Sequence, residues 1–153
     1  MLDWIVLFLR AIQFAGAAVL FGTPLFYFYA KQRPQHWHKV LAVAAVITVL
    51  TTLFLAAWAQ SALLLGNWPD TGVADIRWYL TETRIGQIML ARFAAVGVYA
   101  FLLRLPTATN RHLAQMALGG VILASFAWTG HGAERGGLYA ITDVVHLLMA
   151  GIW

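Results

Sequence analysis

The 153-residue chain is 61% hydrophobic and only 10% charged, and its mean hydropathy is +0.74. Soluble domains average about 45–50% apolar and about 25% charged residues, so this composition excludes an ordinary soluble fold and a disordered chain. The net charge of +4 comes from basic residues that are spread between apolar runs, which leaves no basic patch for nucleic acid.

Four apolar runs are long enough to cross a bilayer, whose core of about 30 Å requires about 20 helical residues. They cover residues 4–30, 40–65, 85–105 and 112–129. The one sizeable loop, residues 66–83, is predicted to contain a short interfacial helix at residues 74–80. A fifth apolar run covers residues 138–153. It would span roughly 24 Å as a helix, so we interpret it as a span cut off partway.

The fold class predicted from these runs is an all-α, polytopic transmembrane bundle with four full spans and a truncated fifth. Residues 1–153 then form a single transmembrane domain, which we interpret as a fragment of a longer protein. Orientation follows from the Lys and Arg residues. Five lie in or beside the links after the first and third spans, and three lie on the opposite side. The positive-inside rule therefore places those two links in the cytoplasm and the N-terminus outside.

Polar side chains inside a membrane are costly and usually face the bundle interior or water. In this sequence they are predicted to lie at one depth, in the outer half of the membrane. The residues concerned are Arg10, Gln60, Arg92, His131, Asp143 and His146. Because they come from five different helices, we expect a shared polar level near the outer face.

The spacing of two histidines indicates a candidate metal site. His131 ends the fourth span and His146 lies fifteen residues later in the fifth. A short antiparallel connection places the end of one helix beside the start of the next, so the two rings are predicted to approach within metal-bridging reach. Cysteine is absent, and two imidazoles suit copper, zinc or haem iron.

Asp143, His146 and Met149 follow one another at intervals of three residues and therefore share a helix face. Asp143 can orient the ring of a metal-binding His146, or it can form a structural ion pair with Arg10 or Arg92. His146 can equally be a hydrogen-bonded interior histidine. Met149 is a candidate third ligand if the metal is Cu(I), because a thioether is a soft ligand.

Two further histidines flank Trp37 in the link after the first span, at positions 36 and 38. Such a pair can bind a metal ion, but beside Lys39 we interpret it as an anchor at the membrane interface. The sequence contains no nucleophile–base constellation and no nucleotide-binding loop, so we do not expect an enzyme.

Three motifs give the chain a resemblance to a known family. The third span opens with Thr-Glu-Thr-Arg-Ile-Gly at residues 81–86, and Arg92 follows six residues later. Gly130-His131 ends the fourth span, and the fifth carries Asp143-x-x-His146 followed by Trp153. These motifs resemble the copper resistance protein D family of bacterial inner-membrane proteins. The resemblance covers residues 81–153, and the first two spans agree only in layout.

This resemblance implies copper transport or tolerance at the bacterial inner membrane, with uptake from the periplasm toward the cytoplasm. The outside N-terminus expected from the Lys and Arg residues would then be periplasmic. It implies His131 and His146 as copper ligands, Asp143 and Arg92 as helpers, and a periplasmic copper-binding protein as a partner. Family members continue with further membrane helices, which supports the interpretation as a fragment. Two alternatives stay open: a membrane b-type cytochrome that binds haem b between its helices, and a non-transporting membrane scaffold.

Overall fold

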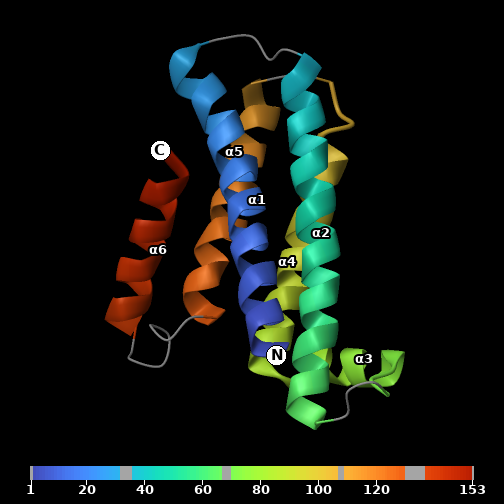
Figure 1. Cartoon of the computed structure of the whole chain (residues 1–153). Helices are drawn as coiled ribbons and strands as arrows, with labels where there is room; N and C mark the ends of the chain where they lie inside the picture. The colour runs from blue at the N-terminus through green and yellow to red at the C-terminus, as the bar shows by residue number, and fades with distance from the viewer. Residues whose placement is uncertain (1, 32–35, 67–69, 107–108, 130–136, 153) are drawn as a thin grey trace.

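The computed structural model describes residues 2–31, 36–66, 70–106, 109–129 and 137–152, and these residues contain helices and no strand. The elements are α1 (Leu2–Ala30), α2 (His36–Leu65), α3 (Val73–Glu82), α4 (Arg84–Leu102), α5 (Thr109–Ala124), the 3₁₀ helix η1 (Ser125–Thr129) and α6 (Gly137–Ile152). Figure 1 shows α1, α2, α4 and α5 running up and down beside one another. The predicted all-α bundle is therefore confirmed.

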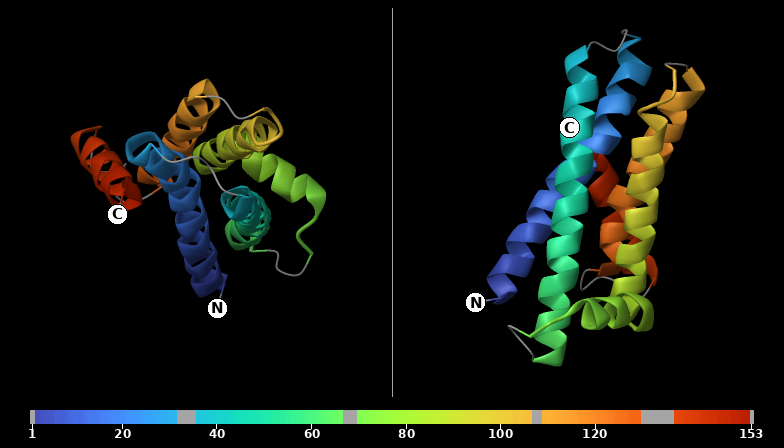
Figure 2. Two further views of the ribbon diagram at one scale, coloured as in Figure 1. Left: turned by 90° about the horizontal axis from the view of Figure 1, so that it is seen from above. Right: turned by 90° about the vertical axis from the view of Figure 1, so that its right-hand side faces the viewer.

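Two ends of this bundle can be distinguished in Figure 1. The N-terminal end, at the bottom, holds the N-terminus, α3 and the beginning of α6. The far end, at the top, holds the end of α1, the beginning of α2 and the turn between α4 and α5. Figure 2 shows that α6 lies at the edge of the bundle, beside α5 and α1, and that α3 lies across the N-terminal end.

Among the described residues, four helices are long and apolar enough to cross a membrane: Asp3–Ala30, His36–Leu65, Arg84–Leu102 and Asn110–Thr129. They confirm the four predicted spans, with differences at the start of the second, at the end of the third and in the helix type at the end of the fourth. The second helix begins at His36, so residues 36–39 are helical rather than part of a link. The third ends at Leu102, before Pro106, and the fourth finishes in the 3₁₀ turns of η1. The interfacial helix is confirmed as α3.

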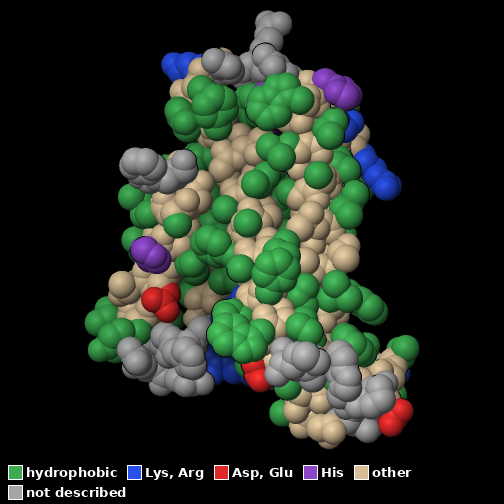
Figure 3. Space-filling model, viewed as in Figure 1, with side chains coloured by type: hydrophobic (Ala, Val, Ile, Leu, Met, Phe, Trp, Pro, Cys, Tyr) green, Lys and Arg blue, Asp and Glu red, His purple; other side chains and the backbone are tan. Residues whose placement is uncertain are grey.

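The surface of the bundle is apolar. Large exposed hydrophobic side chains occur on all four long helices and on α6. On the face seen in Figure 3, hydrophobic side chains cover the middle of the bundle and most charged side chains lie toward its ends. Such a surface suits contact with lipid, because apolar side chains exposed to lipid tails do not carry the free-energy cost that they have in water. The chain is thus an all-α, multi-pass membrane bundle.

Small residues let the helices approach closely. The buried positions of α2 are mostly alanine, and α1 touches α5 at Gly119, where an added Cβ would lie 2.7 Å from the Leu20 carbonyl oxygen. Packing between membrane helices depends on such close contact, since the hydrophobic effect does not drive helices together in lipid. Glycine at position 119 is therefore required by backbone contact between α1 and α5.

Pro24 explains a polar contact between α1 and α4. Proline has no backbone N–H, so the carbonyl of Leu20, four residues earlier, loses its helical partner. The Tyr99 hydroxyl of α4 donates to this carbonyl over 2.9 Å, and both Leu20 and Tyr99 are buried. The helix α1 therefore continues through its proline with a neighbouring side chain in place of the missing hydrogen bond.

The corner between α3 and α4 is built from the Thr-x-x-Gly part of the motif at residues 81–86. The Thr83 hydroxyl accepts from the Gly86 N–H over 2.9 Å and so caps α4. Tyr79 of α3 is buried, donates to Gln60 of α2 and lies 3.7 Å from the sulfur of Met89. Burial raises the pKa of Tyr79 to about 12, so its hydroxyl keeps the proton it donates. These contacts set the depth at which α4 begins.

Candidate functional site

The first feature of the candidate site is Arg92, a buried arginine on α4 with 4% of its surface exposed. Its Nε donates to the Ser125 hydroxyl over 2.6 Å and its Nη2 to the Ser125 carbonyl over 2.8 Å. Nη2 also lies 3.0 Å from the Thr129 hydroxyl oxygen, and the guanidinium carbon lies 4.0 Å from the centroid of the Phe126 ring. Neutral oxygen acceptors and one aromatic face thus surround this cation.

Arg10 of α1 reaches the same place from the opposite side. Its Nη2 donates to the Thr129 hydroxyl over 2.9 Å, so a single oxygen atom accepts from both arginines. From the sequence, an ion pair with one of these arginines was one of two roles expected of Asp143. Within the described residues neither arginine forms an ion pair with a carboxylate, and the hydroxyl groups of η1 take that role instead.

A cavity of about 380 Å³ separates α6 from α1 and η1, and we call it the α6 cavity. Its polar lining consists of Arg10, Asp143 and His146, and the rest is apolar, including Phe14 and Phe126. Asp143 is half-buried and His146 is exposed. The structure therefore brings three of the predicted polar residues to one space, at the N-terminal end of the bundle.

Two other predicted site residues are not brought to this cavity. Met149 is 57% exposed and does not line it. His131 lies outside the described residues. The close approach of its ring to that of His146 therefore stays a prediction. Among the residues that the structure describes, no group of three or more His, Asp or Glu side chains is close enough to hold a metal ion.

A second, smaller cavity of about 190 Å³ lies on the other side of Arg10. Both arginines line it, together with Gln13, Gln60, Met89 and Thr129. Gln13 is buried and donates to the Thr52 carbonyl of α2 over 2.9 Å. This cavity combines two cationic groups with amide and hydroxyl groups, so its electrostatics disfavour a metal cation.

Sequence reasoning missed Ser125, Thr129 and Gln13 as members of the polar level. A signal for two of them was present: Ser125 and Thr129 are four residues apart and therefore share a face of the fourth span. A buried arginine in a membrane needs several acceptors. Counting hydroxyl groups as well as carboxylates at the depth of Arg92 would have pointed to both.

Comparisons with known proteins bear on this arrangement. Residues 1–141 match the family described as copper resistance protein D-like, N-terminal domain. A curated relative, "Copper resistance protein D" of Pseudomonas syringae pv. tomato, is 32% identical over 162 aligned positions. The alignment covers 94% of this chain and 51% of the relative, so the chain spans about half the length of the curated relative it matches. No solved structure matches the chain.

The family match is longer at one end than the resemblance seen in the sequence motifs. It includes the first two spans, which were expected to agree in layout only, and it ends at residue 141. Asp143 and His146 lie just beyond that limit, whereas Arg10, Arg92 and Thr129 lie within it. On this match, the chain belongs to the family of copper resistance protein D-like N-terminal domains.

Proposed function

We propose that this chain takes part in copper resistance as a membrane protein that carries copper ions across the bacterial inner membrane. Family membership supports copper as the cargo. The observation that carries the proposal is the α6 cavity, which is open to an imidazole, a carboxylate and a guanidinium group at one end of the bundle. The imidazole can bind a metal ion and the carboxylate can offset its positive charge, while the guanidinium group of Arg10 is held by the Thr129 hydroxyl.

The proposed copper ligands are His146 and His131. Imidazole binds copper in both oxidation states, and the chain offers no thiolate. Asp143 lies one turn before His146 on the same helix face, where a carboxylate can accept the ring N–H that does not face the metal and so fix the tautomer. Because Met149 does not line the cavity, we assign the third position to water or to a residue outside the described part of the chain.

Arg10 and Arg92 have a positioning role in this proposal. Both hold Thr129, the last residue of η1, and His131 follows Thr129 by two residues. These hydrogen bonds hold η1 against α1 and α4, so the chain that leads on to His131 starts from a fixed position. In this proposal, that fixed start directs His131 toward α6. The arginines would then act on copper through the backbone of η1 rather than by contact.

The proposed direction of transport depends on orientation. The Lys and Arg bias puts the N-terminal end in the periplasm, where a periplasmic copper-binding protein can deliver the ion. The chain lacks cysteine, so single-cysteine variants at Gln35 and Gly72 can be labelled without background. We expect an impermeant thiol reagent on intact cells to label position 72 and spare position 35. The reverse pattern would overturn the orientation.

The copper site is tested by competition with a Cu(I) chelator on the purified protein. We expect His146→Ala and His131→Ala each to weaken Cu(I) binding at least about tenfold, which corresponds to ~1.4 kcal/mol. Asp143→Asn should have the smaller effect of a residue that orients a ligand. His112→Ala, a histidine at the far end of the bundle, is the matched control and should bind copper like the wild type. Unchanged affinity in the His131/His146 double variant would remove the site.

The same preparation separates copper from the two alternatives. A b-type cytochrome would show a strong visible absorbance band from haem, and a scaffold would bind neither haem nor copper. We expect metal analysis to find copper and the visible spectrum to lack a haem band. A haem band that disappears in His146→Ala would replace the copper proposal with the cytochrome.

A further inference from the structure

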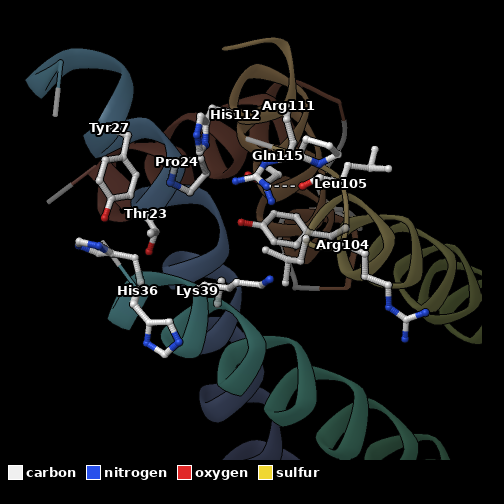
Figure 4. Close-up of a pocket in the computed structure, with 15 residues that line it drawn as sticks. Thr23, Pro24, Tyr27, His36, Lys39, Arg104, Leu105, Arg111, His112 and Gln115 are labelled. Carbon is white, nitrogen blue, oxygen red and sulfur yellow. Dashed lines mark hydrogen bonds between the residues drawn. The ribbon is translucent and has the colours of Figure 1, made fainter. Parts of the chain in front are cut away.

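A third cavity lies at the far end of the bundle, remote from the proposed copper site. It has a volume of about 450 Å³ and lies between α1, α2, the end of α4 and α5. Figure 4 shows its lining, which includes Lys39, Arg104, Arg111, His36 and His112. Fifteen described residues line the cavity, and none of these fifteen is Asp or Glu. A space this size with several basic groups and no carboxylate has a positive potential.

Two of the cations face the cavity and one does not. In Figure 4 the Lys39 side chain of α2 extends into the space, and Arg111 of α5 lies beside the turn that follows α4. Arg111 is held there because its Nη1 donates to the Leu105 carbonyl over 2.6 Å. Arg104 points away from the centre of the cavity in the same view. Lys39 and Arg111 are therefore the charges available to a ligand.

Three residues of α5 that line this cavity carry buried polar atoms. Nε of Arg111, Nε2 of His112 and Nε2 of Gln115 have no hydrogen-bond partner in the described part of the chain. Gln115 is only 3% exposed. Buried polar groups are nearly always hydrogen-bonded, so each orphan needs an explanation. The arginine Nε and the glutamine amide nitrogen can only donate, so the group that would satisfy them is an acceptor.

We infer that this cavity binds a phosphate-bearing anion, either the headgroup of an anionic phospholipid or free phosphate. Phosphate oxygens accept charge-assisted hydrogen bonds from Arg111 and attract the Lys39 ammonium. They also supply the acceptors that the Gln115 amide lacks. Basic pockets between membrane helices are a known way of holding lipid headgroups. The inference is independent of the proposed copper function.

A metal ion fits this cavity less well, although His36 and His38 both line it. Lys39 and Arg111 would repel a copper cation placed among them. No cluster of metal-ligating side chains is found among the described residues, and the unpartnered donors of Arg111 and Gln115 offer no lone pair to a metal. The same groups that disfavour a cation favour an anion.

Bound phosphate would connect α2 with α5 and with the turn after α4 at this end of the bundle. Lys39 belongs to α2 and Arg111 to α5, and Arg111 already reaches the turn after α4. One anion contacting both side chains would join α2 to α5 and to that turn. We therefore expect anion binding to stabilise the protein against thermal unfolding, which provides a measurement that needs no transport assay.

The test compares thermal unfolding of the purified chain in vesicles of phosphatidylcholine, with and without phosphatidylglycerol, and with added inorganic phosphate. We expect one of the two phosphate sources to raise the melting temperature in a saturable way. A response to phosphatidylglycerol alone identifies a lipid headgroup, and a response to inorganic phosphate in phosphatidylcholine identifies the free ion. No response to either source would overturn the inference.

Two variants locate the binding site without disturbing the fold. Lys39→Gln changes an exposed side chain, and Gln115→Leu replaces an unsatisfied buried amide by an apolar group of similar size. We expect each to fold as the wild type does and to weaken anion binding at least about tenfold, the loss typical of one charge-assisted hydrogen bond. Arg104→Gln removes a charge that points away and is the matched control. An equal loss in Arg104→Gln would mean general attraction to a basic end and would overturn the site.

Discussion

The two ends of the bundle differ in whether their buried polar groups have hydrogen-bond partners. At the N-terminal end, two arginines lie within the spans, and each finds hydroxyl or carbonyl acceptors on η1. At the far end, Arg111, His112 and Gln115 retain buried polar atoms that have no hydrogen-bond partner within the described ranges. Satisfied groups hold helices together, whereas unsatisfied ones predict a ligand. The comparison separates a structural network from a candidate binding site by hydrogen-bond accounting alone.

The largest expected effect comes from removing the centre of the satisfied network. Arg92→Leu leaves the Ser125 hydroxyl and carbonyl without their donor and removes one of the two donors to the Thr129 hydroxyl. Each lost partner costs about 1–3 kcal/mol. We expect a loss of about 3 kcal/mol or more in stability, measured as thermal unfolding in detergent by tryptophan fluorescence. Arg104→Leu, at the far end, should change stability by less than about 0.5 kcal/mol. Equally mild effects would mean that Arg92 is not part of a buried network.

A smaller effect is expected at the hydroxyl that the two arginines share. Thr129→Val keeps the shape of the side chain and removes the acceptor, so we expect a loss of about 1–2 kcal/mol. Thr129→Ser keeps the hydroxyl and should restore most of that stability. If copper binding depends on the position of η1, Thr129→Val should also weaken Cu(I) affinity in the chelator competition. Identical stability in the valine and serine variants would show that the hydroxyl is dispensable.

The smallest effect is expected for a neutral hydrogen bond in the core, the one from the Tyr99 hydroxyl to the Leu20 carbonyl. Tyr99→Phe removes the donor to the Leu20 carbonyl that Pro24 leaves free, and we expect a cost of about 1 kcal/mol. Pro24→Ala returns a helical N–H to that carbonyl, so Tyr99→Phe should cost less in the alanine background. The measurement is a double-mutant cycle on thermal unfolding. Additive effects would disconnect Tyr99 from Pro24.

The sequence is sufficient to predict the membrane spans, but it does not predict which side chains become hydrogen-bond partners. Hydropathy identifies the four long helices because about 20 apolar residues are needed to cross a bilayer. It places the start of α2 too late, at residue 40 rather than His36, because a helix continues into the polar interface where hydropathy falls. It also overlooks η1, since a change from α-helical to 3₁₀ hydrogen bonding leaves the apolar pattern intact.

The sequence predicts how deep the residues of the candidate site lie in the membrane, but it does not predict how each helix is rotated about its axis. Arg10, Asp143 and His146 do line one cavity, as their common depth suggested. The choice of Thr129 over Asp143 as the arginine partner depends on how α1, α4 and α6 are turned about their axes, which spacing along a single helix does not determine. The orphaned atoms of Gln115 and His112 likewise emerge only from packing, because in the sequence they are ordinary polar residues near a helix start.

The Thr129 hydroxyl has a further consequence, which follows from its valence. The oxygen has one hydrogen and two lone pairs; the hydrogen goes to the Phe126 carbonyl at 3.1 Å, and the lone pairs accept from Arg10 and Arg92. Its bonding capacity is therefore full. Arg10 cannot turn this donor toward Asp143 across the α6 cavity without vacating a lone pair on Thr129. Position 129 should accordingly accept serine and hardly any other amino acid, since serine alone offers the same count of donor and acceptors at the same reach.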